Sequence, residues 1–438
     1  MPRMAASASP WGQIGFMALA GVAGINAAAA IYSSTLGDLP GGLGMMGSGM
    51  CIAALLVAFA GWHTGHLMDR DTLFDLFAGA LCLAGALGMV LGLIQAFHPQ
   101  WADGLFIAEP TMAGRAVGNL RQPNHFSTLL VWASASAIWL GARKRLPSAV
   151  AAALMALFIW GIVLTASRTG MVAMAFLALW GLLDKRLPRA MRATLIAAPV
   201  LYGMFWGGMW LLAHADKSVT FAAESRLHDH SDISSSRFKI WANVWGLVKQ
   251  YPWTGVGYGE FNIAWTLTSF PTRPVAFFDH THNLIFQWAV ELGLPLTILL
   301  VVLTATAGLV LIWPQASDKI TPVGASAVIV STAMLHSMLE YPLWYSYFLL
   351  PTAFAWGAGL AARATTTEPD ATLKSTTWRP QQWMAAGGAL TMVAAVWCAL
   401  DFQTAANIYA PRAGAGPLDK RIEFGQKMPW FGYQADYA

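Results

Sequence analysis

Residues 284–313 read LIFQWAVELGLPLTILLVVLTATAGLVLIW and contain a single charged side chain, Glu291. About twenty consecutive apolar residues are enough for a helix to cross the hydrocarbon core of a membrane. This run is therefore too long for one untilted span. The sequence Gly293-Leu294-Pro295 predicts a break inside it, because proline cannot continue the hydrogen bonding of a helix. We expect an interfacial or re-entrant opening followed by a crossing helix.

Similar apolar runs recur along the 438 residues, of which 56% are hydrophobic and only 11% are charged. Such a composition excludes an ordinary soluble enzyme. The alternation typical of a porin is absent, so helices are the expected spanning structure. The sequence predicts an all-α polytopic membrane protein with eleven or twelve transmembrane helices, forming a single domain over residues 1–438. The expected spans lie at about 11–32, 43–62, 73–97, 125–142, 147–166, 170–183, 193–213, 284–313, 321–339, 345–362 and 382–400.

Basic residues in short loops predict the orientation, because such loops stay in the cytoplasm. Arg143-Lys144-Arg145 and the basic cluster within 185–192 are two spans apart, and further basic residues fall on the same side: Arg3, Arg70, Lys319, Arg363, Lys374 and Arg379. We expect the opposite face to be the outer face of the membrane. It carries a large loop, 214–282, with shorter elements at 99–124, 167–170 and 340–342, and the chain ends in a tail, 401–438.

Two arginines are expected on this outer face. Arg168 lies directly between two spans, where an arginine is costly unless it is paired or lines a polar cavity. It is either a snorkelling interfacial residue or an anion clamp, since a guanidinium can bind phosphate with two hydrogen bonds. Arg237 follows three serines, 234–236, that are typical of a helix cap. The helical spacing behind it, through Phe238, Trp241, Trp245 and Val248, predicts a surface or interfacial helix, and a plain loop helix is the alternative. The glycines of 251–259 predict a tight turn.

The sequence His280-Thr281-His282-Asn283 stands at the entry to the long apolar run. A metal site needs further ligands at suitable spacing, which the sequence does not offer. A histidine at the membrane surface can accept a proton near neutral pH, and Asn283 can cap the helix that follows. We therefore keep a general base and a plain helix cap as the two interpretations.

Two more polar stretches precede or follow spans on the same face, residues 115–125 and 336–345. Each alone is more typical of structure than of catalysis, but their common location makes them candidates for substrate binding. The candidate binding residues are Arg115, Arg121, Gln122, Asn124, His280, Asn283, His336, Glu340 and Tyr341.

In this order the motifs resemble those of the bacterial O-antigen ligase superfamily, which includes O-antigen ligases, O-antigen polymerases and protein O-oligosaccharyltransferases. The resemblance covers about residues 70 to 360. The matching segments are Gly118–Asn124, Ser167–Gly170, Arg237 with Trp241 and Pro252–Gly259, His282-Asn283 with Glu291–Gly293, and His336-Ser337 with Glu340–Tyr345.

The resemblance implies a glycosyltransferase of the GT-C type whose donor is a glycan linked to undecaprenyl diphosphate. It also implies a bacterial inner membrane, with the outer face and its active site in the periplasm. By motif, Arg168 and Arg237 would bind the donor diphosphate, and His282 would activate the acceptor hydroxyl. Two fixed guanidiniums can stabilise a leaving diphosphate without magnesium. We expect inversion at the anomeric carbon, no cofactor, no metal and no nucleic acid, with the surrounding lipids as the other partner.

The acceptor is less clear from the sequence. The segments Gly118–Asn124 and His336–Tyr345 are similar to those of the protein-glycosylating branch, whereas the short tail after the last span favours the sugar of lipid A-core. The first expectation is thus an O-antigen ligase acting on lipid A-core, with a protein (pilin-type) O-oligosaccharyltransferase as the alternative. A polymerase is a more distant alternative. A transporter also carries intramembrane charges but usually shows internal repeats, which are not visible here.

Overall fold

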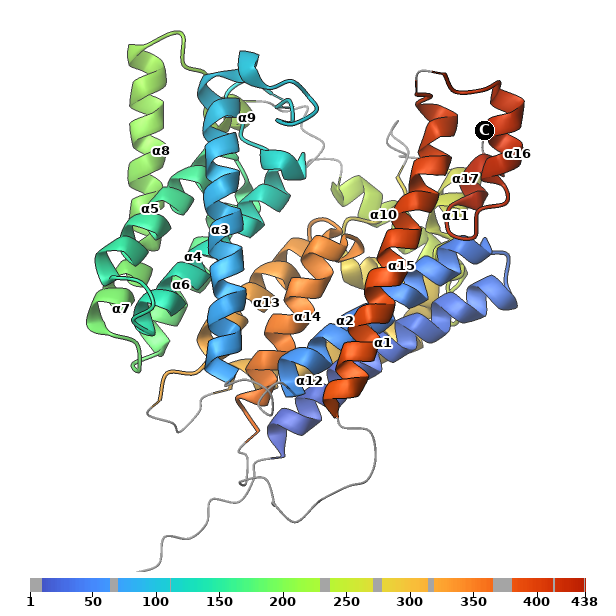
Figure 1. Cartoon of the computed structure of the whole chain (residues 1–438), viewed down its shortest axis with the longest axis horizontal. Helices are drawn as coiled ribbons and strands as arrows, with labels where there is room; N and C mark the ends of the chain where they lie inside the picture. The colour runs from blue at the N-terminus through green and yellow to red at the C-terminus, as the bar shows by residue number, and fades with distance from the viewer. Residues whose placement is uncertain are drawn as a thin grey trace, which may run out of the picture. The chain divides into compact units, whose positions relative to one another are not determined.

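The computed structural model describes residues 10–63, 70–110, 112–228, 237–270, 278–313, 319–364, 380–412, 414–436 and 438. All regular structure in these segments is helical (Figure 1). The chain divides into two compact units. Unit 1 comprises Met1–Ala60, Lys239–Ala307 and Ala364–Ala438, and unit 2 comprises Gly61–Phe238 and Gly308–Arg363. The single domain expected from the sequence stays a prediction.

Within the described residues, six helices are long and apolar enough to cross a membrane: α1 (Trp11–Thr35), α2 (Gly41–His63), α3 (Arg70–Phe97), α4 (Pro123–Ala142), α12 (Leu284–Ile312) and α15 (Pro380–Tyr409). The pair α7 (Arg189–Ile196) and α8 (Ala198–Ala215), bent by 49°, would make a seventh. Four shorter helices occupy the other expected spans: α5 (Ser148–Leu164), α6 (Arg168–Leu183), α13 (Val323–Ser337) and α14 (Ser346–Ala361). The protein is therefore an all-α, multi-pass membrane protein, while the total of eleven or twelve crossings stays a prediction.

Unit 2 is a helical bundle built around α4, which packs against α3, α5, α6 and α13. Nearly every residue of α4 is buried, because its many alanines and serines allow its neighbours to come close. The closest approach is to α6, where a Cβ on Gly170 would lie 1.9 Å from the hydroxyl oxygen of Ser127. Only glycine fits at this position, so α4 fixes where α6 begins.

The basic residues of the predicted cytoplasmic loops lie at one end of unit 2. We call this end the basic end and define it as loops 143–147 and 184–188 with the start of α3. The Asp75 carboxylate accepts hydrogen bonds from the indole of Trp139 at 2.8 Å and the guanidinium of Arg145 at 2.7 Å. Arg143 pairs with Asp71 at 3.0 Å. These ion pairs attach the start of α3 to the end of α4.

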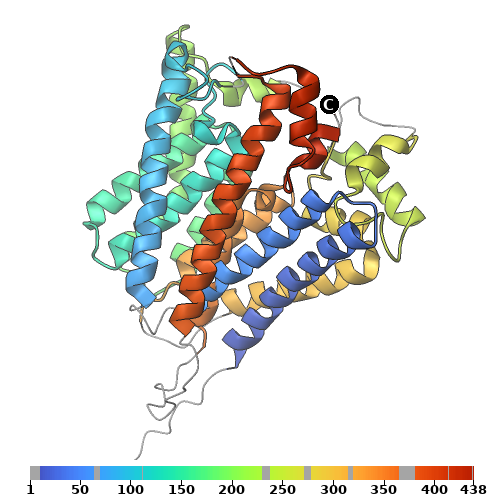
Figure 2. The same cartoon turned by 45° about the vertical axis from the view of Figure 1, so that its right-hand side comes forward.

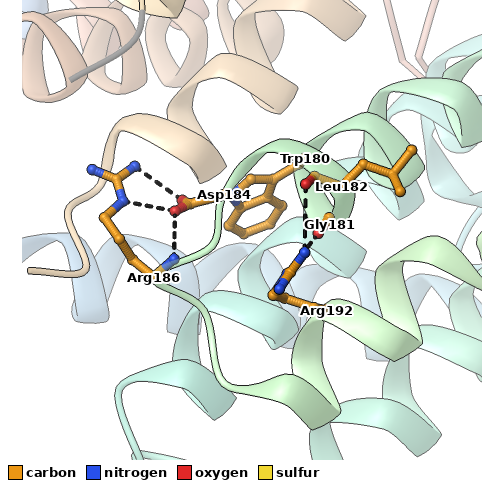
Figure 3. A network of polar contacts seen from close by, with 6 residues as sticks. All are labelled: Trp180, Gly181, Leu182, Asp184, Arg186 and Arg192. Carbon is orange, nitrogen blue, oxygen red and sulfur yellow. Dashed lines mark hydrogen bonds and ion pairs between the residues drawn. The ribbon is translucent and has the colours of Figure 1, made fainter. Parts of the chain in front are cut away.

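A second network at the basic end closes α6 (Figure 3). The carboxylate of Asp184 accepts hydrogen bonds from the Arg186 guanidinium at 2.6 and 3.1 Å and from the Trp180 indole at 3.2 Å. Arg192, on α7, donates to the carbonyl of Gly181 at 3.0 Å. A cation is favourable there, because the last carbonyls of a helix are unpaired and carry partial negative charge.

The opposite end of unit 2, which we call the polar end, holds the starts of α4 and α6 and the ends of α3, α5 and α13. The short helices η2 (Pro99–Trp101) and η3 (Gly118–Leu120) lie between α3 and α4, and η5 (Pro342–Trp344) joins α13 to α14. Beyond α8 follows α9 (Ala222–His228). The sequence elements expected on the outer face, 99–124, 167–170 and 340–342, are all part of this polar end.

In unit 1, α1 and α2 form an antiparallel pair (Figure 2). The indole of Trp288, on α12, donates to the side-chain oxygen of Asn26, on α1, at 3.1 Å. From Lys239 onward the helix α10 (Arg237–Gln250) belongs to unit 1. Together with α11 (Phe261–Leu267) it packs on the first turns of α12 through a shared apolar cluster: Ile240, Val244, Leu247, Val248, Phe261, Trp265, Phe278, Ala289 and Val290. On the same helix Phe238 and Trp245 are exposed.

The predicted break in α12 lies at Gly293, whose φ of 75° is outside the helical range. Pro295 has no N–H, so the carbonyl of Glu291 lacks its usual donor. It instead accepts from the backbone N–H of Gly257 at 3.0 Å, and the carbonyl of Val290 accepts from Val256 at 2.8 Å. The glycine turn after α10 therefore satisfies the backbone groups that the break leaves unpaired.

The tail folds back on α15. Beyond α15 come α16 (Leu418–Gly425) and α17 (Gly432–Asp436). The buried carboxylate of Asp401 accepts hydrogen bonds from the backbone N–H groups of Trp430 at 2.7 Å and Phe431 at 3.1 Å. The segment expected to be only a tail thus begins inside a helix and is anchored to it.

Candidate active site

Arg168 is the first residue of α6, at the polar end of unit 2, and its side chain is exposed. Ser167 caps this helix, because its hydroxyl accepts from the N–H of Gly170 at 3.2 Å. The same hydroxyl donates to the side-chain oxygen of Asn124, at the start of α4, at 2.7 Å. The start of a helix favours anions, since its first N–H groups are unpaired. This position therefore suits the anion-clamp interpretation of Arg168.

The segment 115–124 packs directly against this turn. The N–H of Ala116 donates to the carbonyl of Leu164 at 3.0 Å, and the Arg115 guanidinium donates to the carbonyl of Thr165 at 3.0 Å. The side chain of Gln122 caps α4 by accepting from the N–H of His125 at 2.7 Å. Arg115, Gln122 and Asn124 thus have structural contacts, and their role in substrate binding stays a prediction.

Arg237, the second predicted phosphate ligand, is the first residue of α10 and belongs to unit 2 together with Arg168. Its guanidinium donates to a carboxylate oxygen of Glu340, 103 residues away in the chain, and the two side chains are only 19% and 13% exposed. Glu340 is itself positioned by α13, because its N–H donates to the carbonyl of His336 at 2.8 Å. The structure therefore gives Glu340 a partner that the sequence did not reveal.

Two buried histidines with aromatic neighbours, His125 and His336, lie at the same end of unit 2. The imidazole of His336 is hydrogen-bonded through Nδ1 to the hydroxyl of Thr128 at 2.9 Å, and that of His125 to the hydroxyl of Tyr347 at 3.1 Å. The two imidazole rings lie 5.3 Å apart. Sequence reasoning selected His336 and placed His125 at the end of a polar stretch, but it did not select Thr128 or Tyr347. One pattern in the sequence could have indicated Thr128: the polar residues 125 and 128 lie three positions apart, on one face of a helix that is buried on all sides.

Tyr341 starts the turn that leads into η5, and its ring stacks on Tyr345 at 6.1 Å. Arg121 donates to the carbonyl of Gly104 at 2.7 Å and has a φ of 58°. Both residues thus shape loops at the polar end, and a role in substrate binding stays a prediction for each.

His282 lies in unit 1, in the loop that leads into α12. Its φ of 56° is in the left-handed region, which is strained for a residue with a side chain. The neighbouring Thr281 holds this conformation, because its N–H donates to Gln287 at 2.8 Å and its carbonyl accepts from the Trp241 indole at 3.0 Å. Strain held by surrounding contacts is a feature of functional sites.

Asn283 caps α12 as expected, since its side-chain oxygen accepts from the N–H groups of Ile285 and Phe286, both at 3.0 Å. His280 differs from His282 in its surroundings. Its Nδ1 lies 2.9 Å from a carboxylate oxygen of Asp279, and the hydrogen bond from His280 lowers the pKa of Asp279. His282 instead has the edge of Phe278 beside it, with ring centres 5.8 Å apart.

The two predicted phosphate ligands therefore share unit 2, and the predicted base lies in unit 1. Their convergence on one substrate stays a prediction. In the described part of the chain, no three His, Cys, Asp or Glu side chains are grouped so that they could hold a metal ion. The metal-independent mechanism also stays a prediction, which a chelator can test.

Parts of the chain match known protein families. Residues 150–301 match the family model described as "O-Antigen ligase". Residues 116–140 match "Protein glycosylation ligase", and residues 325–438 match "Virulence factor membrane-bound polymerase, C-terminal".

Two relatives come from Acinetobacter baylyi. The chain is 26% identical to a "General O-oligosaccharyltransferase" over 299 residues, 66% of this chain and 51% of the relative. It is also 26% identical to a "ComP-specific O-oligosaccharyltransferase" over 312 residues, 70% of this chain and 55% of that relative. The chain thus spans about half the length of these relatives.

The helical bundle and its polar end define a polytopic membrane protein of the oligosaccharide-ligase type. The three family models follow one another along the chain in the segments where the sequence motifs occur. The chain belongs to the O-antigen ligase superfamily.

Proposed function

We propose that the protein is a glycosyltransferase that moves a glycan from an undecaprenyl-diphosphate carrier to a hydroxyl group of a protein, at the periplasmic face of the bacterial inner membrane. Both relatives are described as O-oligosaccharyltransferases, and residues 116–140 match a model for protein glycosylation. These findings favour the alternative of the sequence analysis over lipid A-core as the acceptor. The earlier preference rested on the end of the chain, which has no bearing on the acceptor.

The observation that carries the proposal is the pairing of Arg237 with Glu340 in the unit that also exposes Arg168. Negative charge grows on the diphosphate as its bond to the sugar breaks, and fixed cations stabilise that charge most when they need not reorganise. Glu340 holds one side of the Arg237 guanidinium. The other nitrogens of the planar group can then donate to phosphate oxygens.

The predicted base is His282. The hydroxyl oxygen of the acceptor attacks the anomeric carbon and its proton passes to the His282 imidazole. The bond from that carbon to the diphosphate breaks, and the electron pair leaves with the carrier. Attack from the face opposite the diphosphate inverts the configuration of the sugar.

The acceptor is tested with the purified full chain in lipid nanodiscs and a lipid-linked glycan as donor. A pilin-like protein with exposed serines and lipid A-core are offered separately, and products are followed by mass spectrometry. We expect the glycan on the protein. Glycosylation of lipid A-core alone would overturn the proposal, as would a product in which only the lipid-linked glycan has grown longer.

Glu340 acts in this scheme as a positioning residue for Arg237. Hydrogen bonds to charged groups contribute about 1.5–3 kcal/mol, so we expect Glu340→Ala to lower kcat roughly 30-fold. Glu340→Gln keeps an acceptor oxygen for the guanidinium and is expected to keep activity within a few-fold. The kcat of both variants is measured from initial transfer rates at varied donor concentration. If the glutamine variant is as poor as the alanine variant, the charge itself is required and the positioning role is wrong.

A further inference from the structure

The loop that follows α3 lies at the polar end of unit 2 (Figure 1) and exposes three large apolar side chains. We define the apolar tip as Trp101, Leu105 and Phe106, whose exposed fractions are 60%, 75% and 76%. Exposed apolar side chains that lie next to one another, as Leu105 and Phe106 do, mark a contact with a partner or a membrane more often than single ones. Lipid-facing helices account for many of the other exposed apolar residues, but this loop contains no long helix.

The loop that carries the apolar tip is internally ordered. One carboxylate oxygen of Asp103 accepts hydrogen bonds from the N–H groups of Leu105 at 3.0 Å, Phe106 at 2.8 Å and Ile107 at 2.9 Å. These hydrogen bonds lower the pKa of Asp103, and the bond from Ile107 has the largest effect. The carboxylate therefore keeps the loop closed until the pH falls through this lowered pKa.

The loop is also anchored to the segment that precedes α4. Asn119 donates to the carbonyl of Phe106 at 2.7 Å and accepts from the N–H of Ala108 at 3.1 Å. Arg121 donates to the carbonyl of Gly104 at 2.7 Å. The apolar tip is thus fixed before any partner binds, which reduces the entropy that binding costs. Its anchors lie in residues 116–140, the segment that matches a protein glycosylation ligase.

Helix length places this loop outside the hydrocarbon core. Asp75, at the basic end of α3, is ion-paired with Arg145 and does not belong in hydrocarbon. From Asp75 onward, about 20 residues at about 1.5 Å each cross a core of about 30 Å, which then ends near Gln95. Gln95 is fully buried and bonded to the backbone of Ala108 and Val117, as expected beyond the lipid tails.

Charge next to the apolar tip also disfavours an anionic lipid surface. The carboxylates of Asp103 and Glu109 are exposed on either side of it, with Arg121 as the nearby cation. Because the two carboxylates outnumber the one guanidinium, the rim of the apolar tip is acidic. Such a rim is repelled by anionic lipid headgroups and attracted to a basic protein surface.

We infer that the apolar tip docks the protein acceptor, by inserting Leu105 and Phe106 into an apolar patch with a basic rim beside the hydroxyl that is glycosylated. This inference rests on the proposed function and specifies how its acceptor is recognised. Exposed aromatic and aliphatic anchors on a rigid support are the usual centre of a protein–protein contact. The contact binds the acceptor and takes no part in the chemistry.

The test uses the full chain with the double substitution Leu105→Ser and Phe106→Ser. Loss of such anchors typically weakens binding by about 30-fold or more, so we expect KM for a pilin-like acceptor protein to rise by this factor at unchanged kcat. Transfer to a short serine peptide from the same protein is expected to be unaffected. Phe424→Ser, at a residue that is 57% exposed on α16, is the control and should change neither.

A second variant, Asp103→Ala, leaves the apolar tip in place but removes the carboxylate that orders the loop. It is expected to raise KM for the protein acceptor as the double variant does. An unchanged KM in both variants would overturn the inference while the proposed function stands. A wild-type chain that modifies no protein would overturn the proposed function itself. A spin label at position 105 that is buried among lipid tails in nanodiscs would show that the apolar tip binds the membrane instead.

Discussion

Arg237→Ala is expected to lower kcat/KM for glycan transfer by about 10³-fold, because in the proposed mechanism it removes a preorganised donor to the leaving diphosphate. The loss should be larger than for Glu340→Ala, which leaves the guanidinium present but poorly oriented. Arg237→Lys keeps the charge but loses the planar fork, and we expect it to recover only a small part of the activity. Arg168→Ala is expected to match Arg237→Ala, since the proposed mechanism assigns both guanidiniums to the same developing charge.

The measurement is transfer of a lipid-linked glycan by purified protein, with expression and membrane insertion checked for each variant. Arg189→Ala is the matched control, because Arg189 is an exposed arginine of the same unit at its basic end. Full activity of Arg237→Lys would contradict phosphate binding through two hydrogen bonds. Loss of wild-type activity in excess chelator would show that a metal, and not the arginines alone, neutralises the diphosphate.

Much of the fold could be predicted from the sequence, because the hydrocarbon core imposes a length and an apolar composition on each span. The break at Gly293 was predicted for the same kind of local reason, since Pro295 two residues later removes a donor. The kink after Ile196 was not predicted. The basic residues of α7 were assigned to a loop, whereas they lie on a short helix whose Met191 and Leu195 are buried.

The site was less predictable, because its contacts join residues that are distant in the chain. The pair of Arg237 and Glu340 spans 103 positions, and no local pattern indicates it. Arg121 was selected as a polar residue near a span, yet its contact to the carbonyl of Gly104 orders a loop. Residue type alone cannot distinguish a side chain that binds substrate from one that holds the backbone.

His282→Asn is expected to lower kcat by about 10²–10⁴-fold, the contribution of a general base. Asparagine tolerates the left-handed backbone conformation that His282 adopts, so this variant keeps the loop and removes only the proton acceptor. His282→Ala would combine lost chemistry with added strain and is less informative.

His280→Asn is the matched control for this prediction. His280 is paired with Asp279, and we expect the variant to keep activity within a few-fold. If instead His280→Asn abolishes transfer and His282→Asn does not, His280 is the base. Added imidazole provides a readout that a purely structural role would not show. It should restore part of the activity to the His282→Asn protein, because a diffusible base can replace the missing one only where the hydroxyl and the diphosphate are still correctly placed.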